Sequence, residues 1–165
     1  MALYDAAGAP TGVVAPRWLV YRDGLWHAAT GVLLRSTDGR RVYLHRRTDT
    51  KLVHPGAYDC WAGGVVDPGE SPDDAAVREL AEELGVHDVP LEPLDRYVYD
   101  DGRLRYHVFA YQAFWDGPVT WQPEEVAWGD WVTVAELRAV LADPACSFAP
   151  DGRLGAERWL AERSI

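Results

Sequence analysis

The sequence predicts an α/β protein in which a mixed β-sheet packs between helices. Strand-like segments precede and follow one strong amphipathic helix, and elements in this order pack as a sheet covered by helices. The chain has 165 residues, 48% of them hydrophobic and 25% charged, which is the composition of an ordinary globular protein. We therefore expect one domain over residues 1–165, which is large enough to bury a core of its own.

Strands and turns are expected on the N-terminal side of that helix. Residues 1–16 are rich in Ala, Gly and Pro, and we expect them to be loosely packed. Residues 25–35 and 41–45 have the character of strands, and the turn-forming pair Asp38-Gly39 separates them. A further strand is expected over residues 57–66, where two glycines interrupt it.

The central helix is expected over residues 72–84. Ser71 can cap its first turn, Pro72 suits the first helical position, and Asp74 completes an S-x-x-D start. Gly85 is a natural helix end. Beyond it we expect strands at residues 94–99, 105–114 and 126–134, and helices at residues 135–141 and 155–163.

Composition narrows the class of partner. The formal net charge is −10, and a long contact with a nucleic-acid polymer needs a basic surface, so we expect none. No apolar run approaches the roughly 20 residues that cross a bilayer, and the N-terminus lacks the pattern of a signal peptide. We expect a cytoplasmic protein with no membrane contact. Cys60 and Cys146 form no CxxC pattern, so neither a disulfide framework nor a structural zinc site is expected.

Three glutamates share one face of the central helix. Glu79, Glu82 and Glu83 are spaced i, i+3 and i+4, while apolar residues that include Val77 and Leu80 form the opposite, core-facing stripe. Two carboxylates about 5 Å apart repel by roughly 3 kcal/mol at an effective dielectric constant of about 20. Such a cluster is hard to explain unless a cation lies among the carboxylates.

Acidic residues outnumber basic ones throughout this region. Between Asp67 and Glu83 the one basic residue is Arg78, against seven acids. Hard oxygen ligands in such excess suit Mg²⁺ or Mn²⁺. The alternative is a solvated acidic helix face. Against it, Glu82 and Glu83 lie near the C-terminal end of the helix, where the helix dipole disfavours negative charge.

The spacing of residues 64–86 resembles the Nudix box. Gly64, five residues, Glu70, seven residues, Arg78-Glu79-Leu80, one residue, Glu82-Glu83, one residue and Gly85-Val86 match that motif at every fixed position. Outside the box the chain is similar to the isopentenyl-diphosphate-isomerase-like branch of the superfamily, in His45-Arg46-Arg47, Lys51, Pro55-Gly56, Glu124-Glu125-Val126 and Trp131-Val132. The resemblance implies a Nudix-type α/β/α sandwich in which the box forms a loop, a helix and a loop.

The resemblance also implies roles for the box residues. Glu82 and Glu83 would be metal ligands, and Glu79 a further ligand or the base that activates water. The carbonyl of Gly64 would complete the metal shell, Arg78 would hold a box carboxylate, and Glu70 would support the helix and loop through a similar ionic contact.

Residues outside the box are candidates for the same site. Glu125 is the best-placed later glutamate, with an acidic turn before a strand as its alternative explanation. Arg46, Arg47 and Lys51 lie upstream and could bind substrate phosphates, with a solvated basic turn as the alternative. Trp61 and Trp128 are candidates to stack on a nucleobase.

These expectations favour a hydrolase over two alternatives. The expected reaction is Mg²⁺- or Mn²⁺-dependent hydrolysis of the diphosphate bond in a small molecule, with a nucleoside diphosphate linked to another group as the default substrate. An isomerase would need a cysteine before Gly-His, but Gly63 and Val65 stand at those positions and Cys60 lies three residues early. A non-catalytic ligand-binding module would usually lack a box carboxylate, and none is missing. Because many family members dimerise, the resemblance leaves a homodimer open.

Overall fold

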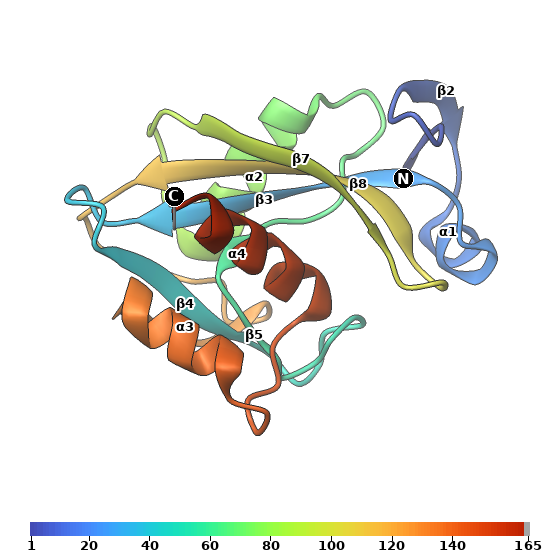
Figure 1. Ribbon diagram of the computed structural model, residues 1–165. Helices are drawn as coiled ribbons and strands as arrows, with labels where there is room; N and C mark the ends of the chain where they lie inside the picture. Colours follow the sequence, from blue (N-terminus) through green and yellow to red (C-terminus); the bar gives the residue numbers. More distant parts are fainter. Residues whose placement is uncertain (164–165) are drawn as a thin grey trace.

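The computed structural model describes residues 1–163 and has a mixed β-sheet between helices (Figure 1). The sheet contains β3 (His27–Arg35), β4 (Arg41–Arg47), β5 (Tyr58–Asp59), β6 (Trp61–Ala62), β7 (Glu92–Asp100), β8 (Arg105–Phe114) and β9 (Val126–Thr133). Its main order is β5-β4-β3-β8-β7, while β6 pairs with β3 and β9 pairs with β4. The pair β3–β8 is parallel, and every other pairing among these strands is antiparallel.

Helices cover both faces of this sheet. Leu33 on β3 packs in one core with Leu137 of α3 (Val134–Ala142) and Trp159 of α4 (Pro150–Glu162). Its neighbours on the strand, Val32 and Leu34, pack instead against α2 (Pro72–Leu84). Because successive strand residues point to opposite faces, β3 supports both layers. Figure 1 shows α4 in front of the sheet and α2 behind it.

The helices and strands expected from the sequence are present, but several begin or end at different residues from those expected. The central helix and the strand at 105–114 have their expected bounds, and the strand at 41–45 extends to Arg47. The last helix begins at Pro150 rather than at residue 155. It includes Gly152 and Gly155, where a Cβ atom would overlap Asp59 and Tyr97. Close packing therefore requires glycine inside this helix.

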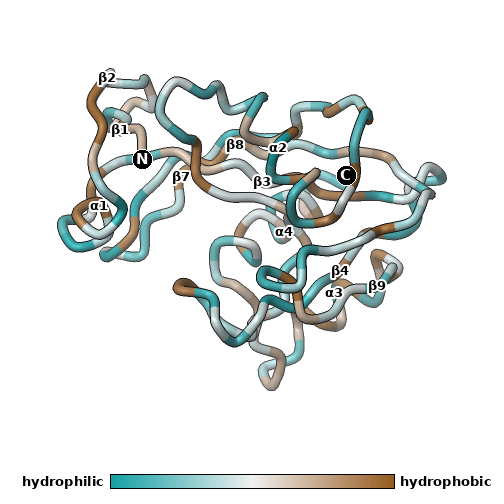
Figure 2. Tube along the Cα trace, turned by 180° about the vertical axis from the view of Figure 1, so that it is seen from behind, coloured by the Kyte–Doolittle hydropathy of each residue, from teal (hydrophilic) through white to brown (hydrophobic). Residues whose placement is uncertain are grey.

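The N-terminal segment is more ordered than its composition suggests. Residues 1–16 contain the hairpin of β1 (Ala2–Tyr4) and β2 (Pro10–Val14), and α1 (Arg17–Asp23) follows. Tyr4 and Ala15 are buried, and the Tyr4 amide donates to the carbonyl of Trp26 at 3.0 Å. The segment therefore forms a hairpin held at Tyr4 and Ala15, while all five residues of β2 are exposed. Figure 2 shows a hydrophobic stretch along the exposed β2.

In the described part of the chain, no helix has the length and apolarity needed to cross a membrane.

Candidate active site

A cleft of about 520 Å³ lies along the acidic face of α2. Its wall includes the loop from Gly63 to Val65, the end of β4 with the segment that follows it, residues 122–125, and the start of α4. The cleft therefore brings together residues that are distant in the sequence.

Local sequence signals place α2 against this cleft. Ser71 accepts a hydrogen bond from the Asp74 amide at 3.1 Å, and Gly85 ends the helix at φ 65°. Leu80 is buried in the core, whereas Val77, expected there as well, is exposed, and Ala75 is buried instead. The opposite face, which contains the three glutamates, turns toward the cleft rather than toward open solvent.

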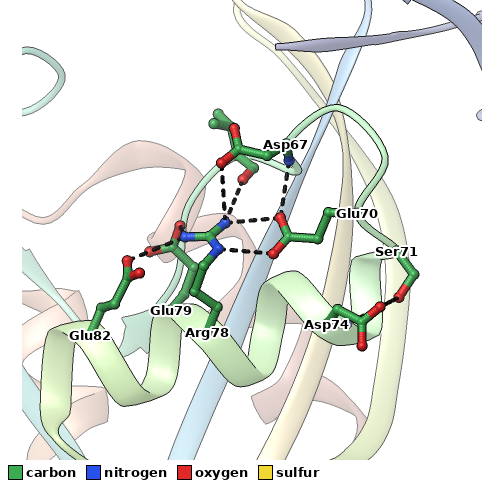
Figure 3. A network of polar contacts seen from close by, with 8 residues as sticks. Asp67, Glu70, Ser71, Asp74, Arg78, Glu79 and Glu82 are labelled. Atoms are coloured by element: carbon green, nitrogen blue, oxygen red, sulfur yellow. Dashed lines mark hydrogen bonds and ion pairs between the residues drawn. The ribbon is translucent and has the colours of Figure 1, made fainter.

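Arg78 connects the acidic residues of the box (Figure 3). Its guanidinium donates to both carboxylate oxygens of Glu70, at 2.9 and 3.0 Å. It also donates to Glu79 at 2.7 Å and to Glu82 at 3.3 Å. These contacts raise the pKa of Arg78 and lower the pKa of Glu70. The Arg78 guanidinium therefore orients the carboxylate of Glu70 in the loop and those of Glu79 and Glu82 on the helix.

Glu79 and Glu83 are the buried members of the acidic face. Glu83 is 4% exposed and the Glu79 side chain 13%, whereas the Glu82 side chain is 53% exposed. Burial, with Glu79 as the next cause, raises the pKa of Glu83 to about 7, and burial also raises the pKa of Glu79. Both carboxylates are thus destabilised in their charged form, and a cation would relieve this cost.

The glycine loop lies directly against these carboxylates. The Gly63 amide donates to Oε2 of Glu83 at 3.0 Å. A Cβ atom at Gly64 would overlap the Glu79 carboxylate, so any larger residue there would displace that carboxylate. The carbonyl oxygen of Gly64 accepts from the Thr30 amide at 2.8 Å. One lone pair of that carbonyl remains for a further contact.

The acidic face fits a divalent cation by its chemistry. Among residues 1–163, no three acidic, histidine or cysteine side chains already converge as a complete ligand set. Mg²⁺ does not need one, because it commonly binds through one or two carboxylates and keeps several waters. The buried pair Glu79 and Glu83, with Glu82 at the rim, supplies such oxygens.

The basic residues separate into two groups. Arg47 and Lys51 line the cleft, and Lys51 forms an ion pair with Glu125. Burial lowers the pKa of Lys51, whereas the charges of Glu83 and Glu79 raise it. Arg46 is not among the residues that line the cleft and donates to Asp49 at 2.8 Å. Glu125 also lines the cleft.

Several polar residues of the cleft escaped the sequence analysis. They are Arg17, Tyr21, Thr30, His54, Asp59, Tyr97, Tyr106 and Asp151. They come from separate elements, and none belongs to a motif, so no sequence signal identified them. His27 is buried in the cleft wall, and burial lowers its pKa.

The two tryptophans expected to stack on a nucleobase, Trp61 and Trp128, both contact other parts of the protein. Trp61 lines the cleft but is 8% exposed, and its indole N–H donates to the carbonyl of Gly152 at 3.1 Å. Trp128 lies outside the cleft, with its ring edge-on to Tyr58.

Cys60 is buried in the core with α3 and α4 and is not among the cleft residues. Its position gives no support to isomerase chemistry.

Comparisons with known proteins identify the family. The NUDIX domain model matches residues 25–151. A protein of Rhodococcus erythropolis, named an uncharacterized Nudix hydrolase, is 50% identical over 162 residues, covering 93% of this chain and 87% of that protein. A relative with the same description from Streptomyces coelicolor is 46% identical and covers 90% of this chain and 82% of its own length. The chain therefore belongs to the NUDIX domain family. By family it is a Nudix hydrolase, as the sequence predicts, although these relatives do not specify the branch.

Solved structures share the fold. The crystal structure of a Deinococcus radiodurans protein has a TM-score of 0.81 at 24% identity, covering 96% of this chain and 97% of that one. A MutT protein from Methanosarcina mazei has a TM-score of 0.69 at 22% identity, covering 85% of this chain and 96% of that one. The predicted Nudix-type fold is confirmed.

Proposed function

We propose that this protein hydrolyses the diphosphate bond of a small organic diphosphate in a reaction that requires Mg²⁺ or Mn²⁺. The observation that carries the proposal is that opposite charges share one cleft: the acidic face of α2 lines it together with Arg47 and Lys51, and the charges of Glu83 and Glu79 act on Lys51. The carboxylates can bind a metal cation, and the positively charged Arg and Lys side chains can bind phosphate oxygens. Nudix hydrolases in general use divalent cations such as Mg²⁺, in agreement with this arrangement.

In this proposal Glu79, Glu82, Glu83 and the Gly64 carbonyl hold the cation. When bound, it neutralises phosphate charge and lowers the pKa of water. Arg78 and Glu70 are positioning residues, because their ion pairs orient the carboxylates. Without the Arg78 guanidinium, Glu79 and Glu82 would lose the partner that fixes their side chains.

The remaining residues bind the substrate and move a proton. Arg47 and Lys51 bind the phosphate oxygens and keep the diphosphate beside the acidic face. Glu79, or else Glu125, accepts a proton from the attacking water. The water oxygen bonds to one phosphorus, and the bridging P–O bond breaks with its electrons on the departing phosphate. Burial raises the pKa of Glu79, which makes its carboxylate a stronger base.

The default substrate is a nucleoside diphosphate linked to another group. A cleft of about 520 Å³ is in the usual range for a ligand of that size. Both the diphosphate and the attached group can lie inside it.

Glu82→Gln and Glu83→Gln test this function. Each replacement removes a ligand charge while keeping side-chain size, so kcat should fall on the order of 100-fold. The measurement is phosphate or nucleoside monophosphate release from a panel of nucleotide, sugar-nucleotide and isoprenoid diphosphates with Mg²⁺ or Mn²⁺. Glu162→Gln, at an exposed site on α4, is the matched control and should keep full activity. Unchanged kcat in both cleft variants, or no cleavage by the wild type, would reject the proposal.

A further inference from the structure

One end of the cleft contains polar groups that the proposed hydrolysis does not use. This polar end is defined by His54, Asp59 on β5, Tyr106 on β8 and Asp151 in the first turn of α4. The Tyr106 hydroxyl donates to Oδ2 of Asp151 at 2.7 Å. The Asp59 carboxyl lies so close to Gly152 that a Cβ atom there would overlap it. Three separate elements therefore bring these groups together.

Several atoms of the polar end have unfilled hydrogen-bonding capacity. Asp59 is 6% exposed, and its Oδ1 accepts from the amides of Cys60 and Trp61, at 2.7 and 3.1 Å. No hydrogen bond to its Oδ2 occurs within residues 1–163. Nε2 of His54 and Oδ1 of Asp151 are buried, have no hydrogen-bond partner, and are 3.9 Å apart. This separation is too long for a direct hydrogen bond and leaves both atoms available to a ligand.

Leaving these atoms unpaired has a cost. A buried donor or acceptor without a partner destabilises a protein by roughly 1–3 kcal/mol, so such groups usually bind water or ligand atoms. At the polar end the residues that contain these atoms, His54 and Asp151, line a cleft of about 520 Å³ rather than a closed core. A ligand that enters the cleft can therefore supply the missing partners.

Arg47 relates the polar end to the phosphate-binding region. It lines the cleft, and although burial raises the pKa of both Asp59 and Glu83, the Arg47 charge partly offsets the rise at each, so it acts on both ends. A diphosphate bound at Arg47 and Lys51 would have the acidic face of α2 on one side. The group attached to that diphosphate would extend toward Asp59 and Asp151.

The chemistry of the polar end favours hydroxyl groups over a stacked aromatic ring. Asp151 offers an acceptor, and burial, reinforced by the charge of Asp151, raises the pKa of Asp59 so that it tends to keep a proton and donate. Adjacent hydroxyls both donate and accept, and carboxyl groups commonly bind them, as acidic residues do with the ribose of dinucleotides.

Aromatic rings near the polar end already have partners. Tyr106 packs against His27 and Tyr99, with ring centroids 5.0 and 5.2 Å apart. The Arg158 guanidinium lies 5.0 Å from the ring centroid of Tyr97. These contacts leave less aromatic surface for stacking a nucleobase.

We propose that the polar end binds the hydroxyl groups of a sugar or other polyol esterified to the diphosphate, with Asp59 and Asp151 as the residues that select it. This inference rests on the proposed hydrolase function and names the substrate class of the same cleft. One water cleaves a polyol diphosphate with a free terminal phosphate to the polyol monophosphate and inorganic phosphate, and cleaves one linked to a nucleoside to the polyol monophosphate and the nucleoside monophosphate.

Two diphosphates with equal carbon number test the selection. Ribose 5-diphosphate contains the hydroxyls, and pentyl diphosphate lacks them. With Mg²⁺, kcat/KM measured by phosphate release should be at least about tenfold higher for the ribose compound, as expected from hydrogen bonds to a charged group. Asp59→Ala and Asp151→Asn should each reduce this ratio about tenfold, because the first removes the donor and the second replaces the carboxylate acceptor. Because the ratio compares two substrates on one variant, a general loss of folded protein cancels.

Glu157→Gln is the matched control, since Glu157 is exposed on α4 and does not line the cleft. Its ratio should equal that of the wild type. Equal kcat/KM for the two diphosphates in the wild type would overturn the inference while leaving the hydrolase function in place. A ratio that both the Asp59→Ala and the Asp151→Asn variants retain would also overturn it.

A binding measurement separates the two proposals if no diphosphate is cleaved. Ribose 5-phosphate has no anhydride bond, and its Kd by calorimetry depends on the polar end without any turnover. Weaker binding to Asp151→Asn than to the wild type and Glu157→Gln would support polyol binding even when the hydrolase proposal has failed. No binding to the wild type, or the same Kd in all three proteins, would overturn the polyol proposal as well.

Discussion

Arg46 and Arg47 show how much depends on the direction of a single side chain. They are neighbours on β4, where successive side chains point to opposite faces. Arg47 reaches the cleft, and its Nη2 donates to the carbonyl of Val53 at 3.1 Å. Arg46 pairs with Asp49, outside the cleft. Of the three basic residues expected to bind phosphate, Arg47 and Lys51 have a suitable position and Arg46 does not.

Replacing these basic residues one at a time tests that division. Arg47→Gln and Lys51→Gln should each raise KM for a cleaved diphosphate about tenfold or more, because each removes a charge-assisted hydrogen bond. Arg46→Gln is the matched control and should leave KM within about twofold, a change of a few tenths of a kcal/mol. Steady-state kinetics measure all three variants. An equal rise in KM for Arg46→Gln would contradict the assignment.

His45 gives the protein a pH dependence that does not involve the acidic face. It is fully buried, its Nδ1 has no hydrogen-bond partner, and burial lowers its pKa to about 3. Between pH 3 and 6.5 the unfolded chain therefore binds more protons at this residue than the folded protein does. The folding stability that depends on neutral His45 is present above pH 6.5 and is lost as the pH falls.

His45→Leu should remove this dependence. On lowering the pH from 6.5 to 5, the free energy of unfolding of the wild type should fall by about 2 kcal/mol more than that of the variant. Urea unfolding at the two pH values measures the difference. Parallel pH profiles for the two proteins would show that His45 does not titrate as its burial implies.

At the scale of elements, α2 is the part most completely specified by local sequence. Its bounds, Pro72–Leu84, are the expected ones because Ser71 and Gly85 satisfy the backbone at the two ends. By contrast, the expected strand at 57–66 forms β5, β6 and a bridge between Ala29 and Val65. Its breaks depend on pairing with β4 and β3, which are distant in the sequence.

Ser71→Ala should destabilise the protein by about 1 kcal/mol, because the Asp74 amide loses its acceptor. Ser71→Asn retains a good capping side chain and should recover most of that loss. Chemical unfolding of both variants gives the free energies. If the two substitutions have the same effect, the cap contributes little to the stability of α2.

At the scale of the whole molecule, metal binding should stabilise the folded protein. Glu79 and Glu83 are buried with raised pKa values, so their charges oppose folding at neutral pH until a cation compensates them. A ligand that binds only the folded state adds about 2.7 kcal/mol when its concentration is 100 times its Kd.

Thermal unfolding with and without Mg²⁺ measures this linkage. Tm should rise with Mg²⁺ concentration in the wild type and return to its starting value on chelation. Glu83→Gln should have a smaller rise because it lacks one carboxylate, whereas Glu162→Gln should behave as the wild type does. A Tm that does not respond to Mg²⁺ in the wild type would argue against a metal site on α2.

The sequence alone determined the fold class, the Nudix box and the acidic face of its helix. These features have short-range causes: helical periodicity places Glu79, Glu82 and Glu83 together, and caps next to the helix set its ends. The spacing of residues along the sequence was sufficient to predict these features.

Tertiary structure decided which other residues meet that helix. Asp59 and Asp151 are far apart in the sequence and come together because β5 joins the sheet edge and α4 packs against the sheet through glycines. Strand register directs Arg47, but not Arg46, into the cleft. Sheet order and register depend on contacts distant in sequence, so the spacing that identified the box did not specify these partners.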